Sequence, residues 1–156
     1  MKIVYHCFGG AHASPTAAAI HLGILPKDRW PSFTDFQKIP FFDDTTSITH
    51  GKMVKVGQDY LGNEVYIMGR RNCTQLALNI IREYLKLTGE DPGQYLFVSC
   101  VQMLNPFMVT GGFSSRGMGW VGFGRPIVTF GTILSFRCLV SIVNRTIQDL
   151  ERIKGI

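Results

Sequence analysis

The sequence lacks the features that define several classes of protein. Its four cysteines, at positions 7, 73, 100 and 138, are far apart and form no Cys-x-x-Cys pair, so neither a disulfide framework nor a zinc site is expected. No run of five or more basic residues occurs, which excludes a dedicated nucleic-acid arm. Residues 1–25 lack the basic and apolar regions of a secretory signal, and we expect a cytoplasmic protein with reduced thiols.

The sequence also lacks an uninterrupted apolar segment of membrane-spanning length. Its most apolar stretch, residues 127–143, contains Arg137 and several threonines and serines. A spanning helix needs about 20 predominantly apolar residues, and an arginine in the middle of the span is costly. We therefore expect no membrane span, and we interpret residues 127–153 as one long core or interface helix.

The composition that remains is typical of a folded α/β protein. Hydrophobic residues make up 46% of the 156 residues and charged residues only 17%, which favours a folded chain over a disordered one. The length favours a single domain over residues 1–156. Because predicted strands alternate with predicted helices, we expect a three-layer sandwich around a mainly parallel sheet. The net charge of +5 favours anionic ligands.

Hydrophobic periodicity predicts the elements of the central and C-terminal regions. Alternation with a period of two indicates strands, helical spacing indicates helices, and a near-continuous apolar run is typical of a buried strand. We expect, in chain order, a β-hairpin over 52–68, a helix over 72–87, a buried strand over 94–101 and the final helix after Pro126. The long connection over 26–50 shows neither period, and we interpret Asp43 and Asp44 within it, like Asp59 in the hairpin, as turn residues.

The most informative segment is residues 2–22, which we interpret as a strand, a glycine-containing loop and an alanine-rich helix. Gly9 and Gly10 permit a tight turn or a close approach of the backbone to a ligand. Ser14 followed by Pro15 is typical of a helix start with Ser14 as the N-cap. The first turn of such a helix presents unpaired backbone N–H groups and the positive end of the helix dipole. The segment therefore predicts an anion site, for which phosphate is the expected ligand class.

The candidate site residues follow from this interpretation of the loop. Cys7 and His12 are the candidate catalytic residues, because thiols at helix N-termini are reactive and a neighbouring histidine can act as a charge partner. A cation from elsewhere in the chain would complete an anion site. The expected ligand-binding residues are Gly9, Gly10, Ala11, Ser14, Arg116 and Arg125. No metal site and no particular cofactor are predicted.

The motifs in residues 5–14, 59–66, 69–71, 111–116 and 124–126 resemble those of a bacterial family found in Firmicutes, domain of unknown function 3189. The likeness extends over nearly the whole chain, and the opening motif, Tyr-His-Cys-Phe-Gly-Gly-Ala-His-Ala-Ser, is specific. The resemblance implies no particular activity, because the family has no settled one.

The loop is also locally similar to the phosphate loop of low-molecular-weight tyrosine phosphatases, Cys-x-Gly-x-x-x-Arg-Ser-Pro. Cys7, Gly9, Ser14 and Pro15 match that pattern, whereas Ala13 stands where the phosphatases have a phosphate-clamping arginine. A weaker similarity exists to the Walker A loop, in which Ser14 would be the Ser/Thr and Ala13 replaces the lysine. Both resemblances imply phosphate binding more strongly than turnover.

Three functional hypotheses result. The first is a P-loop-like site that binds phosphate, a nucleotide or a phosphorylated metabolite. In the second, Cys7 is the nucleophile of a phosphatase-like enzyme or a redox thiol, with His12 as its charge partner. The third is a non-enzymatic interaction protein, because apolar residues lie on more than one face of the helix predicted over 127–143, which favours a two-fold homodimer.

Overall fold

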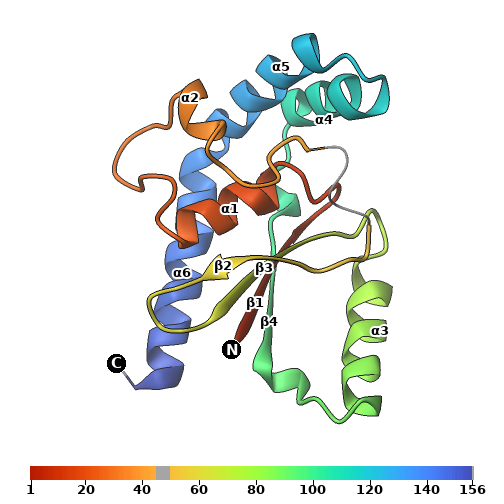
Figure 1. The fold of residues 1–156 in the computed structure, drawn as a ribbon, viewed down its shortest axis with the longest axis vertical. Helices are drawn as coiled ribbons and strands as arrows, with labels where there is room; N and C mark the ends of the chain where they lie inside the picture. The colour runs from red at the N-terminus through yellow and green to blue at the C-terminus, as the bar shows by residue number, and fades with distance from the viewer. Residues whose placement is uncertain (45–49, 156) are drawn as a thin grey trace.

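A four-stranded sheet with β1 as an inner strand organises the molecule (Figure 1). The computed structural model describes residues 1–44 and 50–155. The strands are β1 (Lys2–Cys7), β2 (Val54–Gln58), β3 (Glu64–Gly69) and β4 (Tyr95–Ser99). The helices are α1 (Ala13–His21), α2 (Phe33–Phe36), α3 (Thr74–Leu87), α4 (Pro106–Gly112), α5 (Val121–Leu134) and α6 (Phe136–Lys154). The 3-10 turns η1 (Pro92–Gln94) and η2 (Val101–Met103) flank β4, and the π-helical turn η3 (Phe113–Gly117) follows α4.

The strand order within the sheet is β2-β3-β1-β4. β1 is parallel to both neighbours, and its Tyr5 lies opposite Ile67 of β3 and Val98 of β4. β2 pairs antiparallel with β3, as expected for the hairpin predicted over 52–68. The mixed α/β class is thus confirmed, but the sheet is only partly parallel because the hairpin adds an antiparallel strand. The single domain and the three-layer arrangement stay predictions.

The two faces of the sheet contact different helices. Ile3 and Tyr5 of β1 belong to the larger apolar cluster, which also contains buried residues of α1 and α6. Val4, on the opposite face of the same strand, packs with Met68 of β3 and Leu78 of α3. The side-chain alternation of β1 therefore places α1 and α3 on opposite faces of the sheet.

The first helix begins two residues before the predicted start at Pro15. His12 occupies the N-cap position, and its carbonyl oxygen accepts hydrogen bonds from the Thr16 amide at 3.0 Å and the Thr16 hydroxyl at 2.7 Å. The prediction of Ser14 as the N-cap was wrong, because its hydroxyl lies 3.2 Å from the Cys7 sulfur instead of over a backbone N–H. This difference brings the serine into the loop site.

The helix predicted over 127–153 is two helices. α5 begins at Val121, so Pro126 lies within it, and α6 is turned by 57° from α5 at a break next to Ser135. The Ser135 hydroxyl donates to the Met103 carbonyl at 2.7 Å and accepts from Asn105 at 2.9 Å. These bonds anchor the break to the segment that follows β4.

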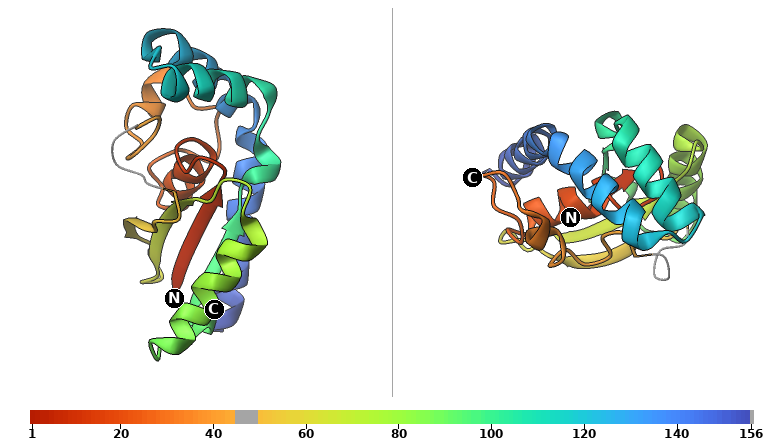
Figure 2. Two further views of the ribbon diagram at one scale, coloured as in Figure 1. Left: turned by 90° about the vertical axis from the view of Figure 1, so that its right-hand side faces the viewer. Right: turned by 90° about the horizontal axis from the view of Figure 1, so that it is seen from above.

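The glycine-rich residues 105–125, for which the sequence predicted no element, form α4, η3 and the first turn of α5. Figure 2 shows α4 and α5 side by side at one end of the molecule, beyond the carboxyl ends of the strands. Among the described residues, no single helix is long and apolar enough to cross a membrane. α5 and α6 meet that criterion of length and composition only when taken together as a bent pair.

Candidate functional site

The loop of residues 8–12, here called the Cys7 loop, leaves the carboxyl end of β1 between the ends of its two neighbours. Backbone N–H groups of Arg70 and Arg71 donate to the carbonyls of Cys7 and Phe8 at 3.1 and 2.9 Å. On the other side the Cys100 amide donates to the His6 carbonyl at 2.8 Å. The chain passes from β1 to β3 on one side and later to β4 on the other, so the loop lies at the topological switch point, where open α/β sheets bind ligands.

The conformation of the Cys7 loop depends on two glycines. Gly10 has a φ of 75°, a left-handed conformation that glycine adopts without strain. Its N–H donates to the Cys7 sulfur at 3.1 Å. A Cβ at Gly69, at the end of β3, would lie 2.6 Å from the Gly9 carbonyl oxygen, so a larger residue there would displace the loop. The sequence therefore folds a tight turn around the thiol.

Most backbone N–H groups of this turn have no acceptor among the residues that the structure describes. In the part of the chain that the structure describes, no hydrogen bond is donated by the amides of Gly9, Ala11, His12, Ala13 and Ser14. The helix dipole adds partial positive charge at the same place. Four of the five residues are fully buried or nearly so, and buried backbone donors are normally paired. These donors are suited to an anionic acceptor.

Cys7 lies beneath the loop and is only 2% exposed. Its sulfur contacts the Gly10 N–H and the Ser14 hydroxyl, as described above. The neighbouring His6 accepts a hydrogen bond at 2.8 Å from the Nε of Arg70, which is itself buried. Burial, and then the charge of Arg70, lower the pKa of His6 to about 4. His6 is therefore neutral and holds Arg70 close to the end of β1.

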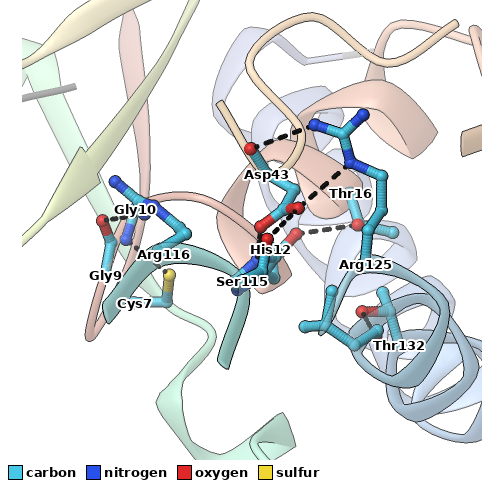
Figure 3. A network of polar contacts seen from close by, with 11 residues as sticks. Cys7, Gly9, Gly10, His12, Thr16, Asp43, Ser115, Arg116, Arg125 and Thr132 are labelled. Carbon is cyan, nitrogen blue, oxygen red and sulfur yellow. Dashed lines mark hydrogen bonds and ion pairs between the residues drawn. The ribbon is translucent and has the colours of Figure 1, made fainter. Parts of the chain in front are cut away.

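A buried carboxylate, Asp43, connects the start of α1 with α5 and η3 (Figure 3). Its Oδ1 lies 2.9 Å from His12 Nε2, and its Oδ2 accepts from the Ser115 hydroxyl at 2.6 Å and from Arg125 Nε at 3.1 Å. The Asp43 amide donates to the Ala11 carbonyl at 2.9 Å. We call Asp43, His12, Ser115 and Arg125 the Asp43 cluster.

The charges of the Asp43 cluster follow from burial and hydrogen bonding. Burial lowers the pKa of His12, although its bond to Asp43 acts in the opposite direction. Burial would raise the pKa of Asp43, but hydrogen bonds from His12, Ser115 and Arg125 lower it overall. We therefore assign a neutral His12 that donates Nε2–H to an ionised Asp43. His12 Nε2 is directed at Asp43, and the charge pair of His12 with Cys7 stays a prediction.

The two predicted arginines occupy different positions. Arg116, on η3, reaches the Cys7 loop, where its terminal nitrogen lies 3.5 Å from the Gly9 carbonyl oxygen. Its Nε is buried and, among the described residues, has no hydrogen-bond partner. Arg125 instead bonds to Asp43, and about half of its side chain is exposed. Of the two candidate cations, Arg116 lies at the loop and Arg125 at the cluster beside it.

The chain matches a known family over most of its length. The family model described as protein of unknown function (DUF3189) matches residues 2–148. The chain belongs to this family. The matched range includes β1, the Cys7 loop, Asp43 and both arginines, so the DUF3189 region contains the whole candidate site. No curated protein and no solved structure matches the chain.

In this DUF3189 protein, the sequence predicted two members of the Asp43 cluster, His12 and Arg125, as site residues but not the other two, Asp43 and Ser115. Asp43 was interpreted as a turn residue, and its φ of 53° agrees with that backbone role. Its side chain, however, accepts hydrogen bonds from three residues that lie 31, 72 and 82 positions away from it in the sequence: His12, Ser115 and Arg125. No periodic pattern marks such contacts, and Ser115 was marked only as part of the family motif over residues 111–116. Among the described residues, no group of three His, Cys, Asp or Glu side chains could hold a metal ion.

Proposed function

We propose that the Cys7 loop and the first turn of α1 bind a phosphate group, either free or as part of a nucleotide or a phosphorylated metabolite. The observation that carries this proposal is a set of backbone N–H groups at the carboxyl end of β1, those of Gly9 and of residues 11–14, which have no acceptor among the described residues. Backbone N–H groups at a helix N-terminus favour anions through both hydrogen bonds and the helix dipole. The position of the loop at the switch point of the sheet supports the same conclusion.

Arg116 is the cation best placed to complete this site. Its guanidinium already lies at the Gly9 carbonyl, and its buried Nε has a hydrogen to donate. Ala13 leaves the loop without the arginine that the phosphatase pattern would supply. A guanidinium from η3 would bind phosphate oxygens from the opposite direction, through charge-assisted hydrogen bonds. Binding would thereby pair a donor that is otherwise buried alone.

Titration calorimetry with inorganic phosphate, sulfate and common nucleotides tests the proposal. We expect binding at millimolar concentration or below, with amide chemical-shift changes concentrated between Gly9 and Ser14. Arg116→Gln should weaken phosphate binding about tenfold or more, since hydrogen bonds to charged groups contribute roughly 1.5–3 kcal/mol. Arg152→Gln, which removes an exposed guanidinium paired with Asp149 on α6, is the matched control. Absence of any heat or shift change with every anion would refute the site.

A second candidate function is a cysteine-dependent phosphatase, and the bonding of Cys7 favours it. The Gly10 N–H donates to the sulfur, and the Ser14 hydroxyl lies 3.2 Å from it, at the base of the same loop. The thiolate would form a sulfur–phosphorus bond as the ester oxygen–phosphorus bond breaks, and the alcohol would leave with a proton from water. Water would then hydrolyse the thiophosphate to regenerate the thiol and release phosphate.

The two candidate functions are separated by one substitution. Cys7→Ser should abolish hydrolysis of p-nitrophenyl phosphate if the thiol is the nucleophile, and should leave phosphate binding largely intact in either case. Cys100→Ser is the control, because Cys100 is also buried, and burial raises the pKa of its thiol well above the usual value. Hydrolysis that persists in Cys7→Ser, or none in the unaltered protein, would leave binding as the function of the loop.

A further inference from the structure

Large apolar side chains gather on the outer surface of α4, η3 and α5. These residues, which we call the hairpin surface, are each between 44% and 66% exposed: Phe107, Val109, Phe113, Trp120, Phe123 and Phe130. The elements α4, η3 and α5 lie at the end of the molecule beyond the carboxyl ends of the strands (Figure 2). Apolar patches of several hundred Å² are rare on monomeric soluble proteins, and they mark sites of interaction with proteins or membranes.

The elements α4, η3 and α5 form a helical hairpin, and small residues lie on its inner side, where α4 and α5 meet. A Cβ at Gly111 would lie 2.4 Å from the Val128 amide nitrogen, and one at Gly131 would lie 2.7 Å from the Met108 amide nitrogen. A Cβ at Gly124 would lie 2.3 Å from the Ser115 nitrogen. Helices in water normally place their large apolar residues between them. Glycines lie where α4 and α5 approach most closely, as in helices that pack in lipid. The aromatic side chains lie at the rim of this contact, where Phe107 and Phe130 meet edge to face at 5.4 Å, or outside it.

The charges of this part of the chain fit an anionic partner. Residues 92–148 contain four arginines and no aspartate, glutamate or lysine. Arg116 and Arg125 extend from the hairpin toward the body of the protein (Figure 3), and Arg137 lies over the ring of Trp30 at 5.2 Å. The hairpin surface therefore presents no carboxylate to repel lipid phosphates, and cationic groups lie behind its aromatic residues.

We propose that the hairpin surface docks on an anionic phospholipid bilayer. The aromatic side chains would enter the boundary between headgroups and acyl chains, and the half-exposed Arg125 and the exposed Arg137 would remain at the level of the phosphates. α5 has 14 residues and is thus roughly 21 Å long, shorter than the ~30 Å hydrocarbon core. The hairpin therefore lies in one leaflet. A second copy of the chain is the alternative occupant of this surface.

Vesicle flotation of the full chain tests the proposal directly. The probes are vesicles of phosphatidylcholine alone and vesicles of equal parts phosphatidylcholine and phosphatidylglycerol. We expect flotation with the anionic vesicles and much less with the neutral ones, and weaker binding at high salt. In a Trp30→Phe background, the fluorescence of Trp120 should shift to shorter wavelength when anionic vesicles are added.

Paired substitutions make the test specific for the hairpin. Phe113→Ser with Phe123→Ser removes two exposed aromatic side chains and should lower the vesicle affinity at least about tenfold. Leu76→Ser with Ile80→Ser on α3 is the matched control, because these residues are 62% and 59% exposed, and it should leave vesicle binding unchanged. Equal loss in both variants, or no flotation with either vesicle, would overturn the proposal. Failure to bind vesicles, together with self-association that only the hairpin variant abolishes in sedimentation velocity, would assign the surface to a second copy.

Discussion

Two buried histidine–aspartate pairs lie at opposite ends of α1, and they differ in what surrounds them. At the C-terminal end, His21 Nε2 lies 3.0 Å from Asp59 Oδ2, and both side chains are fully buried. At the N-terminal end, His12 and Asp43 form the corresponding pair at 2.9 Å. The same two side chains thus meet at both ends of one helix, but only the second pair adjoins the Cys7 loop.

The partners of each carboxylate explain the difference. Asp59 is satisfied within its own turn, where Oδ1 accepts from the amides of Leu61 and Asn63 at 2.9 and 2.7 Å. His21 in turn accepts from the Tyr5 hydroxyl through Nδ1, across 2.7 Å, so that pair is a closed structural unit. Asp43 finds its partners on α1, η3 and α5, and one of them, Arg125, is half exposed. A carboxylate bound by distant segments can transmit a change at one of them to the others.

The largest expected effect on stability comes from removing Asp59, the acceptor of the His21–Asp59 pair. Asp59→Ala leaves the His21 N–H, the Asn63 side-chain amide and two turn amides without their acceptor inside the protein. Buried donors without partners are costly, and the free energy of unfolding should fall by about 3–5 kcal/mol. Urea denaturation measures this loss. Phosphate binding by the protein that remains folded should be unchanged, and weakened binding would show that the two ends of α1 are coupled.

Removal of Asp43 should lower the stability less than removal of Asp59 does, but it should weaken phosphate binding. Asp43→Ala should lower the free energy of unfolding by about 2–3 kcal/mol, because Arg125 can turn to water while His12 and Ser115 cannot. It should also weaken phosphate binding several-fold, since the His12 ring loses the bond that fixes the first turn of α1. Urea denaturation and calorimetry on the same preparation check both effects. A variant that binds phosphate as tightly as the original protein would separate the cluster from the site.

Acid should destabilise the protein through the histidines of both pairs. Burial lowers the pKa of His12 and of His21, whereas in the unfolded chain histidine titrates near about 6.5. Below that pH the unfolded state binds protons that the folded state does not, so the stability conferred by each neutral histidine is lost as the pH falls. The expected slope is about 1.4 kcal/mol per pH unit for each histidine, from about pH 6.5 down to its folded pKa.

Single substitutions assign that slope to the two ends of α1. We expect His21→Gln and His12→Gln each to reduce the slope of the free energy of unfolding against pH, measured by urea denaturation between pH 7 and 5. The reduction should be about 1.4 kcal/mol per pH unit, which corresponds to one proton. Glutamine retains an N–H donor for the carboxylate, so a good part of the neutral-pH stability should survive. An unaltered slope in either variant would mean that its histidine is protonated in the folded state.

The elements that the sequence predicted well are those encoded by local patterns. Within residues 2–22, the strand follows from β-branched residues and the helix from an alanine run, and the structure contains both as β1 and α1. The single helix over 127–153 was wrong because helical propensity continues through Ser135, while the break there depends on hydrogen bonds to Met103 and Asn105. Asp43 and Ser115, two of the four members of the Asp43 cluster, were missed for the same reason. Contacts between segments dozens of residues apart leave no periodic trace.

The smallest expected effect concerns Ser115, the member of the Asp43 cluster with the simplest role. Its hydroxyl donates to Asp43 Oδ2 at 2.6 Å, and its loss leaves one oxygen with Arg125 as its remaining partner. Ser115→Ala should lower the free energy of unfolding by about 1 kcal/mol. Ser114→Ala is the neighbouring control, because its hydroxyl caps only the Thr110 carbonyl at an exposed position, and it should stay within about 0.5 kcal/mol of the original protein. Equal effects of the two substitutions in urea denaturation would indicate that the Asp43 cluster adds no more to stability than an exposed hydrogen bond does.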